Sequence, residues 1–292
     1  MSRLNSIQEY LAAAFVMVAL GLGIAAVTSP ASAQDLGSND PTARQVGAVN
    51  CSLCDLRYRR YIRGQLSGSV FKGAFLFRAD FSNAVVTKSD FESANMVLAT
   101  LERADFSKSN LSKANLSRAA MLGTTLRGAA MIFTDLQDAY LEGAELTDAN
   151  MTGADLRGAN LFRAFADKVI LRNADLRGAN MQRANMRRAG MEGAKLAGAD
   201  LAGADLTMVN LSNADLRGAN LTGADLSYAR LLGADLRRAK LGGTTLYGTN
   251  MKEADFRGAD LTGARIASVV RTGTNFCRAI MPNGNPGACP KK

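Results

Sequence analysis

Large apolar residues recur at every fifth position over most of the chain. From Leu56 to Ile266 these central positions hold Leu, Met, Phe, Tyr, Val or Ile, with Ala166 as the exception, and no insertion or deletion breaks the phase. The position two residues before each central one is small and mostly Ala. The residue between the two is Asp or Asn in more than half of the repeats from Phe75 to Arg265. The repeat is therefore Ala-(Asp or Asn)-Leu followed by two residues, the second of which is often Gly.

A period of five fits neither regular element. On a helix, a step of five residues rotates the side chain by about 140°, so the central residues would surround the helix instead of forming one face. On a flat strand, odd spacing would place successive central residues on opposite faces. The chain must therefore turn once per repeat, so that each central side chain points inward again. Gly at the turn tolerates positive φ, and Asp or Asn can bond to nearby backbone groups.

Right-angled corners would close a coil after four repeats. The sequence supports a twenty-residue coil independently, because Ala-Asp-Leu-Arg-Gly-Ala-Asn occurs at residues 154–160, 174–180 and 214–220. About eleven such coils at the sheet spacing of about 4.8 Å would make a rod roughly 50 Å long, with a narrow, dry interior walled by Ala. We also expect an internal stack of aromatic rings in its N-terminal half, at Phe71, Phe81, Phe91 and Phe106.

These repeats resemble the pentapeptide-repeat family, and the resemblance covers about 215 of the 292 residues. It implies an all-β solenoid, namely a right-handed quadrilateral β-helix with four pentapeptides in each coil. The family fold carries many unrelated roles, so the resemblance does not by itself name an activity.

The N-terminus has the layout of a secretory signal peptide. Arg3 lies in a short polar start, residues 11–27 are apolar or Gly, and Ala31-Ser32-Ala33 precedes Gln34. A positively charged start, an apolar stretch and a small-residue site predict cleavage between Ala33 and Gln34 and export to the periplasm or beyond the cell. The alternative is an uncleaved anchor, because 17 apolar residues are near the lower limit for spanning a bilayer.

The remaining boundaries follow from where the repeat begins and ends. We expect a signal peptide over 1–33, a flexible leader over 34–50, a β-helix over 51–275 with 51–70 as its N-terminal cap or first coil, and a C-terminal cap over 276–292. Caps matter because the open ends of a β-helix expose unpaired edges and apolar interior. Residues 165–170 depart from the consensus in everything but spacing. They form either a local bulge or a variant coil, and the sequence leaves both open.

Four cysteines lie outside the regular repeats, with Cys51 and Cys54 before them and Cys277 and Cys289 after them. An even count in an exported chain suggests disulfides. A Cys277–Cys289 bond would hold the Pro- and Gly-rich tail over the last coil. The Cys51–Cys54 pair admits three readings: a local disulfide, a redox pair or half of a metal site. Since the two pairs lie at opposite ends of the rod, one metal site shared by all four is excluded within a monomer.

The composition removes several kinds of chemistry. The chain has no His, which excludes a His-based triad, an imidazole base and a His-ligated metal. Its carboxylates recur as repeat residues, and a convex, regular solenoid would offer no pocket. No phosphate-binding loop or nucleophile elbow is present in the sequence. We therefore predict no enzymatic activity, no cofactor and no small-molecule substrate.

The net charge of +9 points to the surface as the contact site. Positions twenty apart should stack, which predicts a ladder of Arg beside a ladder of Asp, interrupted at Ala197. The Arg members are Arg157, Arg177, Arg217, Arg237 and Arg257, and the Asp members are Asp155, Asp175, Asp215, Asp235 and Asp255. Further Lys and Arg residues lie on other faces, among them Lys88, Lys108, Lys113, Arg118, Arg163, Arg183, Arg187 and Arg188. The ladder is either a solvated face that keeps the rod soluble or a docking surface for a regularly spaced anionic partner.

Three functions compete on these observations, the third being an enzyme or redox protein. The first is a rigid scaffold of the cell envelope that binds a protein or an anionic envelope component. The second comes from the resemblance, because some pentapeptide-repeat proteins mimic duplex DNA and shield a topoisomerase, DNA gyrase. That reading implies an acidic cytosolic rod, whereas this chain is basic and carries an export signal. Direct nucleic-acid binding is disfavoured because no aromatic stacking residues are interleaved with the basic ones. Whether the rod forms a homodimer stays open.

Overall fold

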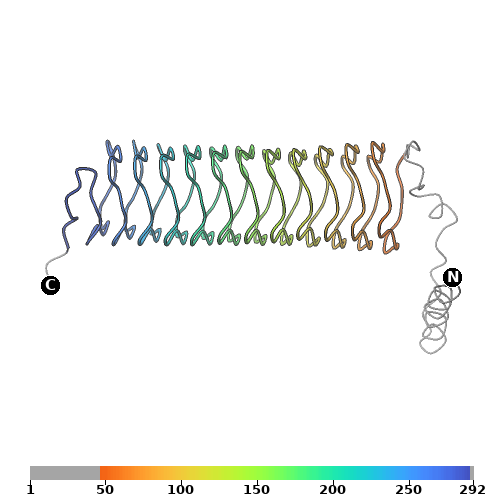
Figure 1. The fold of residues 1–292 in the computed structure, drawn as a ribbon, viewed down its shortest axis with the longest axis horizontal. Coiled ribbons are helices and arrows are strands. Elements are labelled where there is room, and N and C mark those ends of the chain that lie inside the picture. The colour runs from red at the N-terminus through yellow and green to blue at the C-terminus, as the bar shows by residue number, and fades with distance from the viewer. Residues whose placement is uncertain (1–46, 290–292) are drawn as a thin grey trace, which may run out of the picture. The chain divides into compact units, whose positions relative to one another are not determined.

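The computed structural model describes residues 47–289. The expected signal peptide, its cleavage site at Ala33 and Gln34, and most of the expected leader lie outside these residues. The described part contains no helix and no strand longer than one bridged residue. Each pentapeptide instead consists of a turn and a single bridged residue, and four of them make one coil of a quadrilateral β-helix. The coils follow one another along a common axis in chain order (Figure 1).

Neighbouring coils are in register throughout. Every fifth residue, from Asn50 to Asp260, forms a parallel bridge with the residue twenty further along, so the last parallel bridge reaches Ile280. The backbone hydrogen bonds run both ways between coils: the N–H of Leu156 donates to the carbonyl of Asp175 at 2.7 Å, and the N–H of Asp175 donates to the carbonyl of Ala154 at 2.9 Å. The predicted twenty-residue coil is confirmed.

Each corner is a four-residue turn with a left-handed third residue. In the turn that begins at Met151, the N–H of Ala154 donates to the carbonyl of Met151 at 3.1 Å, and Gly153 has a φ of 66°. Positive φ at the third position is the mark of a type II turn. The bridged residue supports the next corner, because Asp155 Oδ1 accepts a hydrogen bond from the N–H of Arg157 at 3.2 Å. Both backbone roles expected for Gly and Asp are confirmed.

The interior is the predicted stack of central residues walled by Ala. Central side chains from Leu56 to Leu261 are at most 2% exposed. The expected aromatic stack is present and includes Tyr61, whose ring stacks on Phe81 with centroids 4.7 Å apart. Where a hydroxyl residue replaces Ala it stays buried by bonding to the backbone, as Thr134 Oγ1 does with the carbonyl of Leu111 at 2.8 Å.

Residues 165–170 continue the coil in regular register, so the reading as a local bulge is wrong and the reading as a variant coil is right. The bridges of Phe165 to Glu145 and Asn185 and the turn hydrogen bond from Val169 to Ala166 are all in phase. The physical reason is an exchange of volume: Ala166 is small at a central position, and Val169 is large at the neighbouring wall position. Both side chains are buried, and the core stays filled.

Disulfides lie at both ends of the described chain, pairing Cys51 with Cys54 and Cys277 with Cys289. The second is the pairing preferred from the sequence, and the first selects the local disulfide from the three readings of Cys51 and Cys54. At the C-terminal end the chain folds back, with an antiparallel bridge between Ile280 and Pro286. Within residues 47–289, no helix is long and apolar enough to cross a membrane.

Candidate binding face: the arginine–aspartate ladder

The structure brings the ten predicted surface residues together in two adjacent columns. The five Asp residues occupy the bridged position of successive coils, with Asp155 bridged to Asp175 and Asp215 bridged to Asp235. The five Arg residues follow two positions later, at the second residue of the turn. Lys195 and Ala197 interrupt the columns in one coil. We call this set of ten residues the ladder.

Each ladder Arg forms a bidentate pair with the Asp two residues before it. Arg177 Nε donates to Asp175 Oδ1 at 2.8 Å, and its Nη2 donates to Asp175 Oδ2 at 2.7 Å. Two parallel N–H···O bonds of this kind are both strong and directional. The same fork is present at the other four ladder arginines. The spacing of two residues within one turn therefore fixes where each guanidinium lies.

Ladder residues of opposite charge also lie close together across neighbouring coils. Asp235 Oδ2 lies 2.7 Å from Arg237 Nη2 and 3.8 Å from Nε of Arg217 in the preceding coil. Asp255 lies in the same way between Arg257 and Arg237, at 2.6 and 3.8 Å. Each of these carboxylates thus faces two guanidiniums. The adjacent columns therefore relieve the repulsion between like charges within each column.

The two columns differ in depth. The ladder Arg side chains are 41–53% exposed, whereas their Asp partners are 16–29% exposed. Hydrogen bonds from Arg177 and Arg217 hold the pKa of Asp175 and Asp215 below the usual range. At Asp255, burial raises the pKa, but the bonds from Arg257 outweigh it and the pKa is lowered. The carboxylates of Asp175, Asp215 and Asp255 are therefore ionised at neutral pH. Because the Arg side chains are the more exposed partners, the outer layer of this face is cationic.

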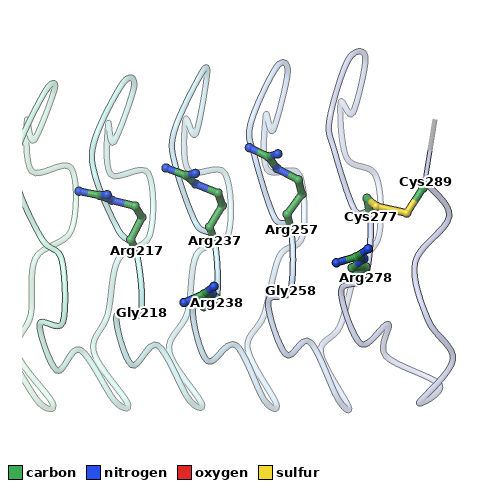
Figure 2. A pocket seen from close by; sticks show the side chains of 9 residues that line it. All are labelled: Arg217, Gly218, Arg237, Arg238, Arg257, Gly258, Cys277, Arg278 and Cys289. Carbon is green, nitrogen blue, oxygen red and sulfur yellow. A yellow bond between two sulfur atoms is a disulfide. The ribbon is translucent and has the colours of Figure 1, made fainter. Parts of the chain in front are cut away.

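The C-terminal end of the ladder opens into a shallow depression of about 810 Å³ (Figure 2). Its lining includes three ladder arginines, two arginines that the sequence analysis did not single out, and the Cys277–Cys289 disulfide. The arginines are Arg217, Arg237, Arg238, Arg257 and Arg278. The depression arises because a corner that alternates Gly and Arg leaves hollows between the long side chains.

Arg238 and Arg278 occupy the left-handed turn position, with φ of 58° and 60°. Neither forms an ion pair with any carboxylate in residues 47–289. Gly258 lies between them in the same column, one coil from each. A signal for this arrangement was available in the sequence, since writing the chain in rows of twenty places the two arginines on either side of a Gly. No group of His, Cys, Asp and Glu in the described residues could hold a metal ion.

Most of the other basic residues named from the sequence share that turn position, and all of these except Arg118 lie on other corners. They adopt positive φ at Lys88, Lys108, Lys113, Arg118, Arg163, Arg183 and Arg188. Arg187 instead lies one position earlier, where its Nη1 is 3.3 Å from Asp205 Oδ2. These residues add positive charge around the coil without forming a second ladder.

The fold and the ladder define a non-globular repeat protein. Comparison with known families identifies the family to which it belongs. The family model described as Pentapeptide repeats matches residues 65–96, 94–131, 125–161, 170–207, 204–243 and 234–270. The chain belongs to the pentapeptide-repeat family.

Solved structures of pentapeptide-repeat proteins are similar to this chain. HetL, involved in heterocyst differentiation regulation in the cyanobacterium Nostoc, is 30% identical over 70% of this chain and 91% of its own, with a TM-score of 0.46. A protein of the Arabidopsis thaliana thylakoid lumen is 30% identical over 36% and 63%, with a TM-score of 0.25. Full-length QnrB1, a plasmid-mediated fluoroquinolone resistance protein, is 17% identical over 80% and 93%, with a TM-score of 0.24. No curated protein matches the chain.

Proposed function

We propose that the mature chain is an exported, non-enzymatic scaffold of the cell envelope, which docks an anionic partner along the ladder. The observation that carries this proposal is that the ladder Arg side chains are more exposed than their Asp partners. An evenly mixed surface of Arg and Asp would present no net sign to a partner. Here the guanidiniums are the outer layer and the carboxylates lie behind them, so an approaching anion meets positive charge first.

The forks leave donors available for a partner. In each pair the Arg uses Nε and Nη2 on its own Asp, as Arg217 does with Asp215 at 2.8 and 2.7 Å. Its Nη1 has no hydrogen-bond partner among the described residues. Because the Asp fixes the guanidinium in advance, little side-chain freedom is lost on binding. The coil spacing of about 4.8 Å repeats this donor along the axis, which suits a partner with repeated anionic groups.

Two observations support export. Disulfides persist in oxidising compartments, and the described chain has two of them and no free cysteine. The similarity to a protein of the thylakoid lumen agrees with a compartment outside the cytosol. Together with the candidate signal peptide over 1–33, these favour the periplasm or the outer surface of the cell.

The alternative of a DNA mimic that binds a topoisomerase such as DNA gyrase requires carboxylates as the outer layer of the rod. The ladder has the opposite order. A DNA supercoiling assay with gyrase tests this alternative directly, and we expect the mature chain to leave the activity of the enzyme and its inhibition by a fluoroquinolone unchanged.

Polyanion binding tests the docking face. The mature chain is titrated with poly-glutamate at low and high salt, beside the ladder variant R157Q/R177Q/R217Q and a control, K88Q/K108Q/R188Q, that removes the same charge from another corner. We expect affinity to fall with salt in the wild type and to fall at least tenfold in the ladder variant, but less than threefold in the control. Binding without salt dependence, or equal loss in both variants, would contradict the proposal. Circular dichroism checks that each variant keeps the fold.

A further inference from the structure

The depression at the C-terminal end of the ladder has a geometry that the rest of the ladder lacks. Arg238 and Arg278 lie in one column with Gly258 between them, and Arg257 lies in the neighbouring column (Figure 2). Two coil spacings separate the backbones of Arg238 and Arg278, which is about 9.6 Å. Since an Arg side chain extends several ångströms, both guanidiniums can reach a group placed above Gly258.

The floor between the two arginines carries no side chain of its own, and the stem of Arg238 borders it. Gly258 has no side chain, and a Cβ built on it would have Arg238 Cγ as its nearest neighbour, at 3.7 Å. The Cys277–Cys289 disulfide lines the C-terminal side of the depression, where the tail passes the last coil. The site is therefore bounded along the rod axis, unlike the flat stretch of the ladder that precedes it.

The charge balance also changes at this end. The three ladder arginines of the depression are neutralised by their own aspartates. The Asp column then stops, because the bridged residue after Asp255 is Asn275. Arg238 and Arg278 have no carboxylate partner in residues 47–289, so their two positive charges are uncompensated. An anion above Gly258 would supply the missing partner.

We propose that this depression binds a phosphate group above Gly258, held by Arg238 and Arg278 with Arg257 as a third donor. The inference rests on the proposed docking function and names phosphate as the group that is docked. Guanidinium forks match phosphate oxygens in pairs, and a phosphate offers enough oxygens for three arginines at once, whereas a carboxylate offers two. A phosphate also fits a compact floor that has donors on opposite sides.

Calorimetric titration with inorganic phosphate, compared with chloride at equal ionic strength, tests the site. Two variants remove it in different ways: R238Q/R278Q removes the donors, and G258N fills the floor with a residue that tolerates positive φ. The controls are K88Q/K108Q on another corner and G178N, a corner where a Cβ meets nothing within 4 Å. We expect phosphate affinity to fall at least tenfold in both site variants and to stay within threefold in both controls. Failure of the wild type to prefer phosphate over chloride, or unchanged affinity in R238Q/R278Q, overturns the site.

Two further arms separate this site from the docking function and identify the source of the phosphate. Poly-glutamate binding that is lost in the ladder variant but kept in R238Q/R278Q, without phosphate preference, overturns the site and leaves docking intact. Phosphate binding without poly-glutamate binding would support the site and contradict the docking function. Repeating the titration with polyphosphate and with phosphatidylglycerol vesicles distinguishes a polymer from a lipid headgroup, because the true source should bind more tightly than inorganic phosphate and should depend on the same two arginines.

Discussion

The N-terminal and C-terminal coils share one backbone but use its outer positions differently. In residues 51–118, the left-handed corner position holds Gly only at Gly68 and Gly73. In residues 153–263, thirteen corners are Gly. A left-handed residue with a Cβ is disfavoured by roughly 1 kcal/mol, so the N-terminal corners carry more backbone strain. Because the coil is the same in both regions, the interior must supply what those corners lack.

The interiors of the two regions also differ, and the aromatic interior belongs to the region that has fewer Gly corners. The N-terminal coils enclose five stacked or edge-to-face aromatic rings, at Tyr61, Phe71, Phe81, Phe91 and Phe106, whereas the ladder coils enclose mainly Leu and Met. The ladder column also changes along the axis: it holds Arg57 beside Asp55 in the first coil, then Phe77, Val97, Ser117 and Gln137, before the ladder arginines begin at Arg157. The comparison shows that buried and bridged positions fix the coil, while the turn positions are free to carry a charged face.

Truncation within the aromatic stack should have the largest effect. Phe81 is fully buried and contacts rings on both sides, with centroids of Tyr61 and Phe91 at 4.7 and 5.9 Å. We expect Phe81→Ala to destabilise the protein by about 3–5 kcal/mol, since it leaves a cavity that the narrow coil cannot close. Phe81→Leu, the matched control, should cost less.

Hydrogen exchange shows where that loss falls. Each repeat contacts only its neighbours, so protection should drop in peptides from residues 61–106 and stay unchanged near residues 201–261. A uniform loss along the whole rod would show that the two regions are not energetically separate and would contradict the comparison.

Exchanging corner residues should have a smaller effect with opposite signs in the two regions. Lys108 has a φ of 59° and Gly198 a φ of 69°, and a Cβ at Gly198 would meet nothing within 4 Å. We expect Lys108→Gly to stabilise its coil and Gly198→Ala to destabilise its own, each by about 1 kcal/mol or less, through backbone conformation alone. Thermal unfolding of the two variants measures the signs. The same sign for both would mean that corner strain is not what distinguishes the regions.

The coil itself could be predicted from the sequence, because an unbroken phase from Leu56 to Ile266 leaves few backbones that keep every central residue inside. The reading of residues 165–170 needed the structure, since only packing shows that Val169 makes up the volume that Ala166 lacks. The ladder columns were also predictable, as they follow from spacing alone.

Other features of the candidate site depend on side-chain geometry, which the spacing of residues in the sequence does not determine. Periodicity places Arg and Asp in adjacent columns, but the fork geometry decides that Arg177 lies outside Asp175. Similarly, the position of Arg238 and Arg278 on a corner can be read from rows of twenty, whereas their lack of a carboxylate partner and the depth of the hollow between them cannot. The identity of the partner is even harder to predict from the sequence, because it depends on the combined shape and charge of several coils.

The pH dependence of stability should show the smallest difference between the regions. Asp175, Asp215 and Asp255 have a lowered pKa in the C-terminal coils, and Asp55, bonded to Arg57, has one near the N-terminus. A carboxyl with a lowered folded-state pKa contributes stability above its unfolded pKa of about 3.9, and this is lost as pH falls through the folded-state value. Because these pairs face solvent, each aspartate should contribute only a few tenths of a kcal/mol.

Acidification from pH 6 to pH 3 should therefore weaken hydrogen-exchange protection more in peptides that contain three such aspartates than in those around Asp55. The variant D175N/D215N/D255N is the matched control: it should be slightly less stable than the wild type at pH 6, and it should lose less on acidification, because Asn does not titrate. Equal acid loss in the wild type and this variant would show that the forks position the guanidiniums without stabilising the coil. In that case the ladder would be a binding surface only, and the stability of the C-terminal coils would come from the Leu interior and the Gly corners alone.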